Sequence, residues 1–447
     1  MLLTPYDTQK SGAAFLAARK RALLADEPRV GKTGAALLAS QRIGAERTLV
    51  VTTKSGGAVW RQAWRDWLGV TDCCISSKGA LKKPTPNRNI IISWGSLVSQ
   101  IDQLAEVQWD LVILDESHYA KNPEAKRSIA ALGPTASPDY SPLEGAFGLT
   151  PYVWFLTGTP VPNLPPDLYP MLRFSVPDRL SEYGVLAYED FYARYCRFYN
   201  KTMRRGNWSR SLRIGLEAKN TEELSEVLSG FWLRRTQKDV GIQEPIYEVL
   251  PLEVTDGQRE ELSNIWASGG MTATDLLDAA DVGETKSLDI HLGPLRRVTG
   301  TIKARPLAEL ICEELDAGTD RIVIMYWHRE VRDHFLKSLA KYRPVFIDGS
   351  CSAEERRAAQ AQFKERSRVA VCQIQAAGEA IDLSNANELV FAEFSFTPKD
   401  MKQAALRITN HNQMRQPRVR VAAIAGTLDE ALQRSLTRKV QSNRKVI

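Results

Sequence analysis

The stretch from Leu111 to His118 restricts most strongly what this chain can fold into. Its first half, Leu111-Val112-Ile113-Leu114, is apolar and mostly branched, which predicts a strand buried on both faces. Its second half, Asp115-Glu116-Ser117-His118, follows where the chain leaves that strand. Open α/β sheets bind ligands outside the carboxyl ends of their strands. Two adjacent carboxylates at this point therefore predict a ligand site, in which Asp115 holds Mg²⁺ through its water shell and Glu116 polarises an attacking water.

Both roles require a phosphate, and an upstream stretch offers a place for one. Asp26-Glu27-Pro28-Arg29-Val30-Gly31-Lys32-Thr33 ends in Gly-Lys-Thr, the end of a phosphate-cradling loop. Backbone N–H groups from Gly31 onward can face the phosphates of a ligand. We expect Lys32 to reach the terminal phosphate and the Thr33 hydroxyl to ligate Mg²⁺.

A third motif, Leu156-Thr157-Gly158-Thr159-Pro160, closes another apolar run at Val153 to Leu156. Each motif alone occurs by chance, and an Asp-Glu pair after a strand is commonly a solvated strand end. Together they resemble the superfamily 2 helicases, in particular the Swi/Snf-like branch of DNA-dependent ATPases. That branch has the same Asp-Glu-Ser-His box and Leu-Thr-Gly-Thr-Pro motif. The resemblance extends from about Leu3 to Lys439 and implies an ATP hydrolase that acts on DNA.

Near the N-terminus, Gln9 precedes Gly12 by three residues, as in the adenine-reading Q motif of the family. A glutamine amide pairs with adenine through one donor and one acceptor. In the family a tyrosine usually precedes this glutamine directly, whereas two residues separate Tyr6 from Gln9 here. The alternative is a surface turn in which Gln9 only starts a helix.

Strands alternating with helices predict a parallel sheet covered on both faces, and the chain has two such sets. We therefore expect an α/β protein of two RecA-like parallel-sheet lobes with helical protrusions. Between strands of the first set, Trp60, Trp64 and Trp67 share one helical face, which predicts core packing and not stacking on bases. The expected strands are 48–51, 90–92, 111–114 and 153–156 in the first lobe, and 322–326, 345–347, 369–372, 389–391 and 419–424 in the second.

The expected domains are a first ATP-binding lobe at 1–250, a connection with a second protrusion at 251–300, and a helicase C-terminal lobe at 301–447. Breaks are expected at Gly269-Gly270 and Gly293-Pro294. In the last lobe the resemblance implies that Gly378 and Asp382 help to bind ATP and that Arg407 reaches the nucleotide as an arginine finger.

A helical protrusion is expected at about 180–240, where the chain departs from simple strand-helix alternation. Within it, Lys201 to Arg213 has five basic residues, one tryptophan and no acidic residue. Arg204, Arg205 and Arg210 are the candidate contacts to DNA backbone phosphates. The alternative is an ordinary solvated loop, since charge runs usually face water.

Two departures from the family pattern stand at functional positions. Arg29 occupies a place in the phosphate loop where the family has glycine, and a positive φ there would strain it. Asn410 stands where a second arginine is usual, and Asn412 where a glycine is usual. Arg415, five residues after Asn410, is a candidate substitute from the next turn, although its register is wrong if the helix is regular.

Composition adds limits. The chain has 447 residues, 25% of them charged, and a formal net charge of +6, which does not by itself separate a nucleic-acid binder from other enzymes. It contains no apolar stretch of eighteen residues and no secretion signal, so no membrane partner is expected. The six cysteines have no Cys-x-x-Cys spacing, which favours a reducing cytoplasm over a zinc or disulfide framework.

These patterns predict an ATP-dependent translocase on double-stranded or branched DNA, with ATP and Mg²⁺ as cofactors. We expect it to remodel forks, recombination intermediates or DNA-bound proteins in a bacterial cell or a phage-infected host. The alternative is a nucleotide-gated DNA-binding or annealing clamp with little ATP turnover, which Asn410 favours. Displacement of RNA polymerase would use the same motor.

Overall fold

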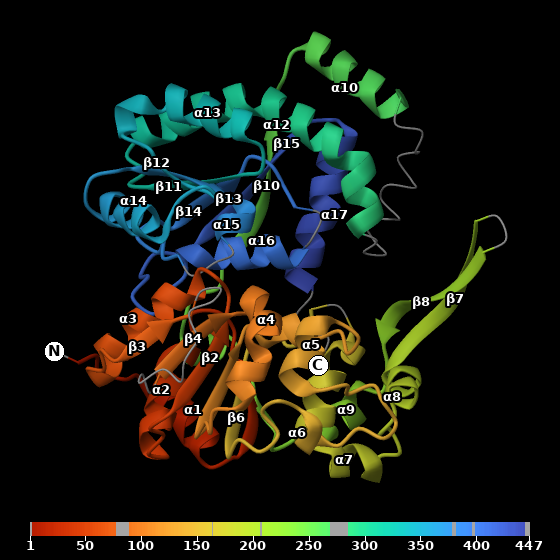
Figure 1. The fold of residues 1–447 in the computed structure, drawn as a ribbon. Helices are drawn as coiled ribbons and strands as arrows, with labels where there is room; N and C mark the ends of the chain where they lie inside the picture. The colour runs from red at the N-terminus through yellow and green to blue at the C-terminus, as the bar shows by residue number, and fades with distance from the viewer. Residues whose placement is uncertain are drawn as a thin grey trace. The chain divides into compact units, whose positions relative to one another are not determined.

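The computed structural model describes residues 2–76, 89–162, 164–205, 208–268, 285–377, 381–395 and 398–442. Two compact units divide the chain, Met1–Thr236 and Gln237–Arg444. Each unit is built around its own parallel sheet with helices beside it (Figure 1). The expectation of two parallel-sheet lobes is confirmed.

The sheet of the first unit has seven strands in the order β3-β4-β2-β5-β6-β1-β9, and each pairing between them is parallel. All four strands expected here are present, each within a residue of its expected ends. The strands are β1 (Arg21–Leu24), β2 (Thr48–Thr52), β3 (Cys73–Ile75), β4 (Asn89–Ser93), β5 (Leu111–Asp115), β6 (Tyr152–Leu156) and β9 (Trp232–Leu233).

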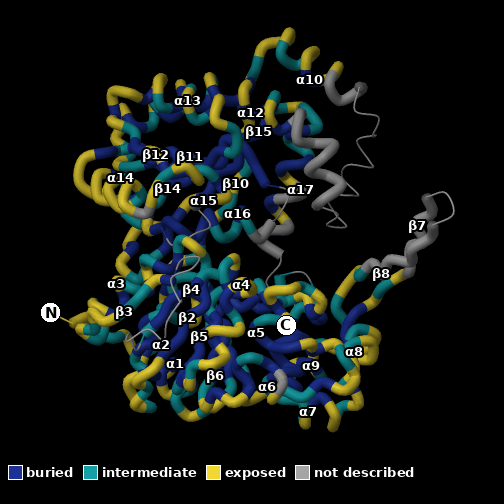
Figure 2. The backbone as a smooth tube through the Cα atoms, viewed as in Figure 1, coloured by how far each residue is buried: buried dark blue, intermediate teal, exposed yellow. Residues whose placement is uncertain are grey.

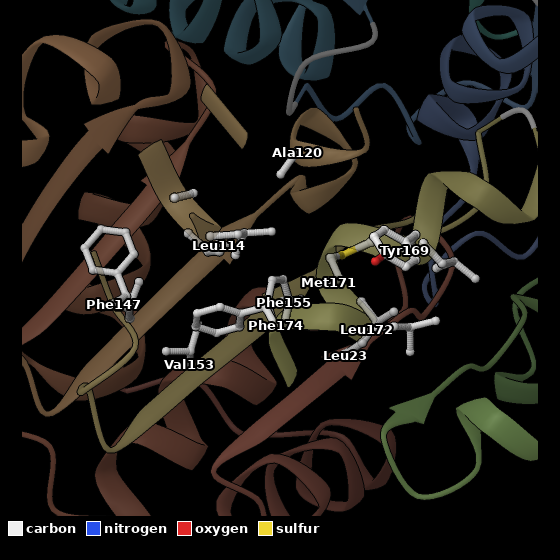
Figure 3. Packing of buried hydrophobic residues seen from close by; sticks show 14 of the residues in the cluster. Leu23, Leu114, Ala120, Phe147, Val153, Phe155, Tyr169, Met171, Leu172 and Phe174 are labelled. Atoms are coloured by element: carbon white, nitrogen blue, oxygen red, sulfur yellow. The ribbon is translucent and has the colours of Figure 1, made fainter. Parts of the chain in front are cut away.

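Alternating residues of β5 pack into two different clusters, which explains why its whole run is apolar. Leu111 and Ile113 join the cluster that contains residues of α1, α2 and α3. Val112 and Leu114 join the cluster on the other face, with residues of α4, α5 and α6; Figure 3 shows part of that packing. The helices are α1 (Asp7–Ala17), α2 (Lys32–Arg42), α3 (Gly56–Leu68), α4 (Trp94–Ala105), α5 (Lys126–Leu132) and α6 (Tyr169–Ser175).

The region expected as a helical protrusion is only partly helical. It contains α7 (Pro177–Glu182), α8 (Tyr188–Tyr195) and α9 (Thr221–Leu228). Its basic stretch is not a loop but an antiparallel hairpin of β7 (Cys196–Arg205) and β8 (Trp208–Ala218), which extends away from α8 (Figure 1). The segment after α9 forms β9, which pairs with β1 and so belongs to the main sheet.

The second unit has a six-stranded sheet in the order β10-β15-β14-β11-β13-β12 with parallel pairings. All five expected strands are confirmed. One strand was not expected: β10 pairs with β15 along its length, so the predicted boundary after residue 250 falls inside a strand. The strands are β10 (Ile246–Leu252), β11 (Ile322–Tyr326), β12 (Val345–Ile347), β13 (Val369–Gln373), β14 (Glu388–Phe391) and β15 (Arg418–Ile424).

One long helix, α12 (Thr285–Asp316), replaces the break expected at Gly293-Pro294. Its C-terminal half buries Leu307, Ile311 and Leu315 against the sheet, and this tertiary packing outweighs the local cost of proline. Figure 2 shows the buried strands as dark blue tubes in each unit. The other helices are α10 (Asp256–Ser268), α13 (Arg329–Ser338), α14 (Ala353–Glu365), α15 (Ile374–Ala377), α16 (Pro398–Ala405) and α17 (Leu428–Ser442).

Candidate active site

Three motifs meet in the first unit because their strands are neighbours. The sheet order β5-β6-β1 places the ends of these strands side by side. The phosphate loop follows β1, the Asp115-Glu116 pair ends β5, and the segment Thr157 to Thr159 follows β6. Since the strands are parallel, all three lie at the same carboxyl edge of the sheet.

The turn into α2 requires glycine at position 31. Gly31 has φ 102°, and a Cβ there would lie 2.6 Å from Nε2 of Gln9. Gln9 is buried, and its Nε2 also lies 2.9 Å from the place of a Cβ on Gly34, in the first turn of α2. Its Oε1 accepts a hydrogen bond from the backbone N–H of Tyr6 at 2.9 Å. Gln9 therefore lies against the phosphate loop, and its reading of adenine stays a prediction.

Arg29 has φ 74°, so its position in the loop does have the left-handed conformation that glycine adopts more easily. An L-residue there costs roughly 1–2 kcal/mol. The strain anticipated for this non-glycine residue is present.

Lys32 begins α2 and bends back over its own loop. Its Nζ donates to the carbonyl oxygens of Asp26 at 2.6 Å and Glu27 at 3.2 Å. Burial lowers the pKa of Lys32, and the charges of Glu116, Asp26 and Asp115 oppose that shift. The present hydrogen-bond partners of the Lys32 ammonium are neutral carbonyl oxygens. A phosphate would bind it more strongly, because hydrogen bonds between two charged groups are stronger than those to neutral acceptors.

Asp115 accepts hydrogen bonds on Oδ2 from Thr52 Oγ1 at 2.7 Å and from Trp60 Nε1 at 2.8 Å. Burial, and then the neighbouring Glu116, raise the pKa of Asp115 to about 6, and these two donors oppose the rise. Trp60 is buried in the core as expected, but its indole N–H also orients the carboxylate. Sequence reasoning missed this role, although a buried indole N–H usually has a partner.

Glu116 has a left-handed backbone conformation with φ 50°, which turns the chain after β5. Its Oε2 lies 3.2 Å from Nδ1 of His118. The same ring nitrogen lies 2.9 Å from Oγ1 of Thr157 and 3.4 Å from Oγ1 of Thr159. His118 therefore connects the end of β5 to the segment after β6.

Gly158 lets the segment after β6 approach the phosphate loop, because it has no side chain. A Cβ on Gly158 would lie 2.9 Å from Cδ of Pro28. The segment after β6 thus packs directly on the phosphate loop, and any larger residue would move one of the two.

The residues present fit a magnesium ion, for which carboxylate, hydroxyl and water oxygens are suitable ligands. The Asp115 carboxylate is partly buried next to a second carboxylate, and a cation would relieve the charge that raises its pKa. Thr33 lies at the second position of α2, one residue after Lys32. Asp115 and Thr33 are the residues that would hold the ion.

In the second unit, Arg407 lies in a short 3-10 turn (Leu406–Ile408) and is only 9% exposed. Its carbonyl accepts the backbone N–H of Leu383 at 3.0 Å. Asp382 is exposed, and its Oδ1 accepts the N–H of Ser384 at 3.1 Å. Gly378 lies outside the described residues.

The chain from Thr409 to Pro417 is irregular, so no regular helix sets the register of Arg415 relative to Asn410. Arg415 donates to the carbonyl of Asn385 at 2.9 Å. Asn410 donates from Nδ2 to Oγ of Ser384 at 3.2 Å. These contacts hold Arg415 and Asn410 to the segment after Asp382.

The predicted DNA contacts lie in the hairpin. Arg204 and Arg205 end β7, and Arg210 of β8 pairs with Met203. Among the described helices, none is long and apolar enough to cross a membrane. All six cysteines are free thiols.

Two parallel-sheet units and a phosphate loop in the first of them are features that helicase-like nucleotide-binding proteins have in common. The SNF2-related domain matches residues 8–292, and the helicase conserved C-terminal domain matches residues 303–412. The chain therefore belongs to the SNF2-related family.

Named relatives span almost the whole chain. The human DNA annealing helicase and endonuclease ZRANB3 is 25% identical over 97% of this chain and 39% of its own length. The SWI/SNF-related matrix-associated actin-dependent regulator of chromatin subfamily A-like protein 1 of Xenopus laevis is 27% identical over 97% of this chain and 43% of its own. The chain thus spans about two fifths of the length of these relatives. Among solved structures, it is similar to the Sulfolobus solfataricus SWI2/SNF2 ATPase core in complex with double-stranded DNA, with 21% identity, a TM-score of 0.45, and coverage of 99% of this chain and 96% of that one.

Proposed function

We propose that this protein couples Mg²⁺-dependent ATP hydrolysis to movement along double-stranded DNA, and that it remodels forks, recombination intermediates or DNA-bound proteins. The observation that carries the proposal is the convergence of Lys32, Asp115 and Glu116 at one edge of the first sheet. The human relative is named a DNA annealing helicase, which supports the choice of DNA as the substrate.

The proposed chemistry assigns one task to each side chain. Lys32 exchanges its two carbonyl partners for phosphate oxygens, and backbone N–H groups at the start of α2 face the same anion. Mg²⁺, when bound, neutralises phosphate charge. Asp115 and Thr33 hold that ion, and Glu116 orients the attacking water and accepts its proton. Arg407 of the second unit, with Gly378 and Asp382, is proposed to act on the same nucleotide.

Steady-state ATP hydrolysis, measured without nucleic acid and with single-stranded, duplex and forked DNA, tests the proposal. Lys32→Ala should weaken ATP binding, because the phosphate loses its ammonium partner. Glu116→Gln should keep ATP binding and lose turnover, because only the carboxylate can accept a proton from water. Equal turnover in Glu116→Gln and the unaltered protein would remove Glu116 from the mechanism.

A second candidate rests on Asn410. An amide there cannot supply the charge of a second arginine finger, which favours a nucleotide-gated DNA clamp or annealing protein with little turnover. The same assay separates the two candidates. DNA-stimulated turnover supports the motor, whereas nucleotide-dependent DNA binding without turnover on any DNA form supports the clamp.

A further inference from the structure

Arg235 joins two segments of the first unit that are far apart in the sequence. Its guanidinium donates to the Asp26 carboxylate from Nε at 3.0 Å and from Nη2 at 2.5 Å, and its backbone N–H adds a third bond at 3.0 Å. From Nη1 it donates to the carbonyl of Thr8 at 2.6 Å and to Oγ of Ser11 at 2.7 Å. One side chain thus holds the entrance of the phosphate loop and the helix that bears Gln9.

The surroundings of Arg235 shield this contact from water, so removal of the guanidinium would leave the Asp26 carboxylate buried without its partner. The side chain of Asp26 is 1% exposed and that of Arg235 15%, so the ion pair is largely shielded from water. Gly12 of α1 makes room, because a Cβ there would lie 2.9 Å from Nη2 of Arg235. The chain beyond β9 continues beside the loop, since the N–H of Glu27 donates to the carbonyl of Arg235 at 2.9 Å.

The same two residues, Asp26 and Glu27, are also the partners of Lys32. Lys32 Nζ donates to their carbonyl oxygens, while Arg235 binds the carboxylate of Asp26 and, by its carbonyl, the N–H of Glu27. When the Lys32 ammonium binds a phosphate, it no longer donates to the carbonyl oxygens of Asp26 and Glu27, and one of the two contacts that fix this segment is lost. Arg235 then remains to hold the loop entrance in place.

We propose that Arg235 is a positioning residue for the nucleotide. By way of Asp26 it fixes the phosphate loop, and by way of Thr8 and Ser11 it fixes the helix of Gln9. A nucleotide contacts the phosphate loop with its phosphates and the helix of Gln9 with its base, so it requires a fixed position of that helix relative to the loop. Inorganic triphosphate has no base and requires the loop alone. This inference rests on the proposed binding of ATP at the loop.

The test compares affinities for ATP and for inorganic triphosphate, measured by calorimetry, together with KM and kcat in the presence of duplex DNA. Arg235→Ala should weaken ATP binding at least about tenfold, equivalent to ~1.4 kcal/mol. KM should rise by a similar factor while kcat changes less than about twofold, because Arg235 touches no reacting atom.

Arg235→Lys is the second variant, and it keeps a charge beside Asp26 if the alanine variant does not fold. A single ammonium lacks the planar fork and cannot bind Asp26, Thr8 and Ser11 together. We expect it to lose several-fold in ATP affinity and to bind inorganic triphosphate nearly as well as the unaltered protein.

Arg19→Ala is the matched control. Arg19 also joins α1 to the segment near β9, by donating to the carbonyl of Gly230 at 2.7 Å, but it does not touch the phosphate loop. It should lower the melting temperature and leave ATP affinity unchanged. ATP affinity in Arg235→Lys equal to that of the unaltered protein would overturn the inference. If the unaltered protein itself binds no ATP, the proposed function fails instead.

Discussion

Arg29 keeps a left-handed backbone in the phosphate loop that glycine would adopt at lower cost. Arg29 has φ 74°, so Arg29→Gly should raise the free energy of unfolding by up to about 1 kcal/mol. The relief of backbone strain in the folded protein should exceed the entropy that glycine adds to the unfolded chain. Urea unfolding measures the change. Arg343, with φ 55° in the second unit, is the control, and Arg343→Gly should give a similar gain.

Nucleotide binding by the same pair of variants separates strain from contact. If Arg29 also contacts phosphate, Arg29→Gly loses ATP affinity and Arg343→Gly does not. A loss of stability in Arg29→Gly would show that contacts of its side chain outweigh the strain.

The raised pKa of Asp115 predicts that this residue makes the folded protein less stable as pH rises, the opposite of the usual effect of a paired carboxylate. Its pKa is about 6 in the folded protein, against roughly 4 in an unfolded chain. The unfolded chain therefore ionises first as pH rises, and the stability that this group contributes below about pH 4 is lost by about pH 6. Without Mg²⁺, Asp115→Asn should therefore be more stable at pH 8, by on the order of 3 kcal/mol, with the difference shrinking towards pH 4.

Asparagine keeps an acceptor oxygen for Thr52 and Trp60, so thermal unfolding of this variant across pH isolates the charge. Binding of Mg²⁺ with ATP to the unaltered protein should weaken as pH falls below about 6, because the proton competes with the metal. A stability difference independent of pH would contradict the assignment.

At the scale of elements, the hairpin β7–β8 gives the next prediction. Replacing Arg204, Arg205 and Arg210 with glutamine should weaken DNA binding about equally for all sequences. It should also reduce the slope of log K against log salt concentration by roughly 0.9 for each lost phosphate contact. The control replaces Arg305, Lys341 and Arg434, which are exposed on helices or turns of the second unit. An unchanged slope in the hairpin variant would make this stretch an ordinary solvated surface.

Most of the strands that the sequence predicted are buried on both faces, although β12 exposes Phe346 and the short buried strand β1 was missed. Runs such as Ile322 to Tyr326 are apolar throughout because alternate residues pack into two clusters. Strand β10 was missed because it lies at one edge of its sheet, where most of its residues are exposed or only partly buried, and it lacks such a run. Strand β9 has only two residues, and its position depends on pairing with β1, about 200 residues earlier.

In the candidate site too, residues within a local sequence pattern could be predicted, whereas contacts between distant segments could not. Lys32, Asp115 and Glu116 could be predicted as candidates because a strand end and a Gly-Lys-Thr turn have local patterns. The hydrogen bonds of Trp60 to Asp115 and of Arg235 to Asp26 join segments that are far apart in the sequence, so no local sequence pattern predicts them. Their only signal was that a buried indole N–H or guanidinium needs an acceptor.

At the scale of the whole molecule, we expect turnover to require the second unit. Arg407→Ala should nearly abolish hydrolysis, since an arginine finger contributes about 10³–10⁵-fold in related phosphoryl-transfer sites. ATP affinity should stay close to that of the unaltered protein, because the proposal assigns binding of the ground-state phosphates to Lys32. Arg415→Ala is the control and should keep its turnover, because Arg415 is held by the carbonyl of Asn385. Loss of turnover in the control alone would show that the finger is misassigned.

Asn410 offers the opposite experiment, in which activity is gained. Asn410→Arg restores the charge that the family usually has there, so DNA-stimulated turnover should rise, provided that the guanidinium reaches the developing charge on the phosphate. The substitution also removes the bond to Ser384, which costs about 1 kcal/mol of stability. Asn412→Arg adds the same charge at an exposed position two residues on, and should leave turnover unchanged. Equal gains in both variants would point to general attraction of DNA, and no gain from Asn410→Arg would show that Arg407 alone is sufficient.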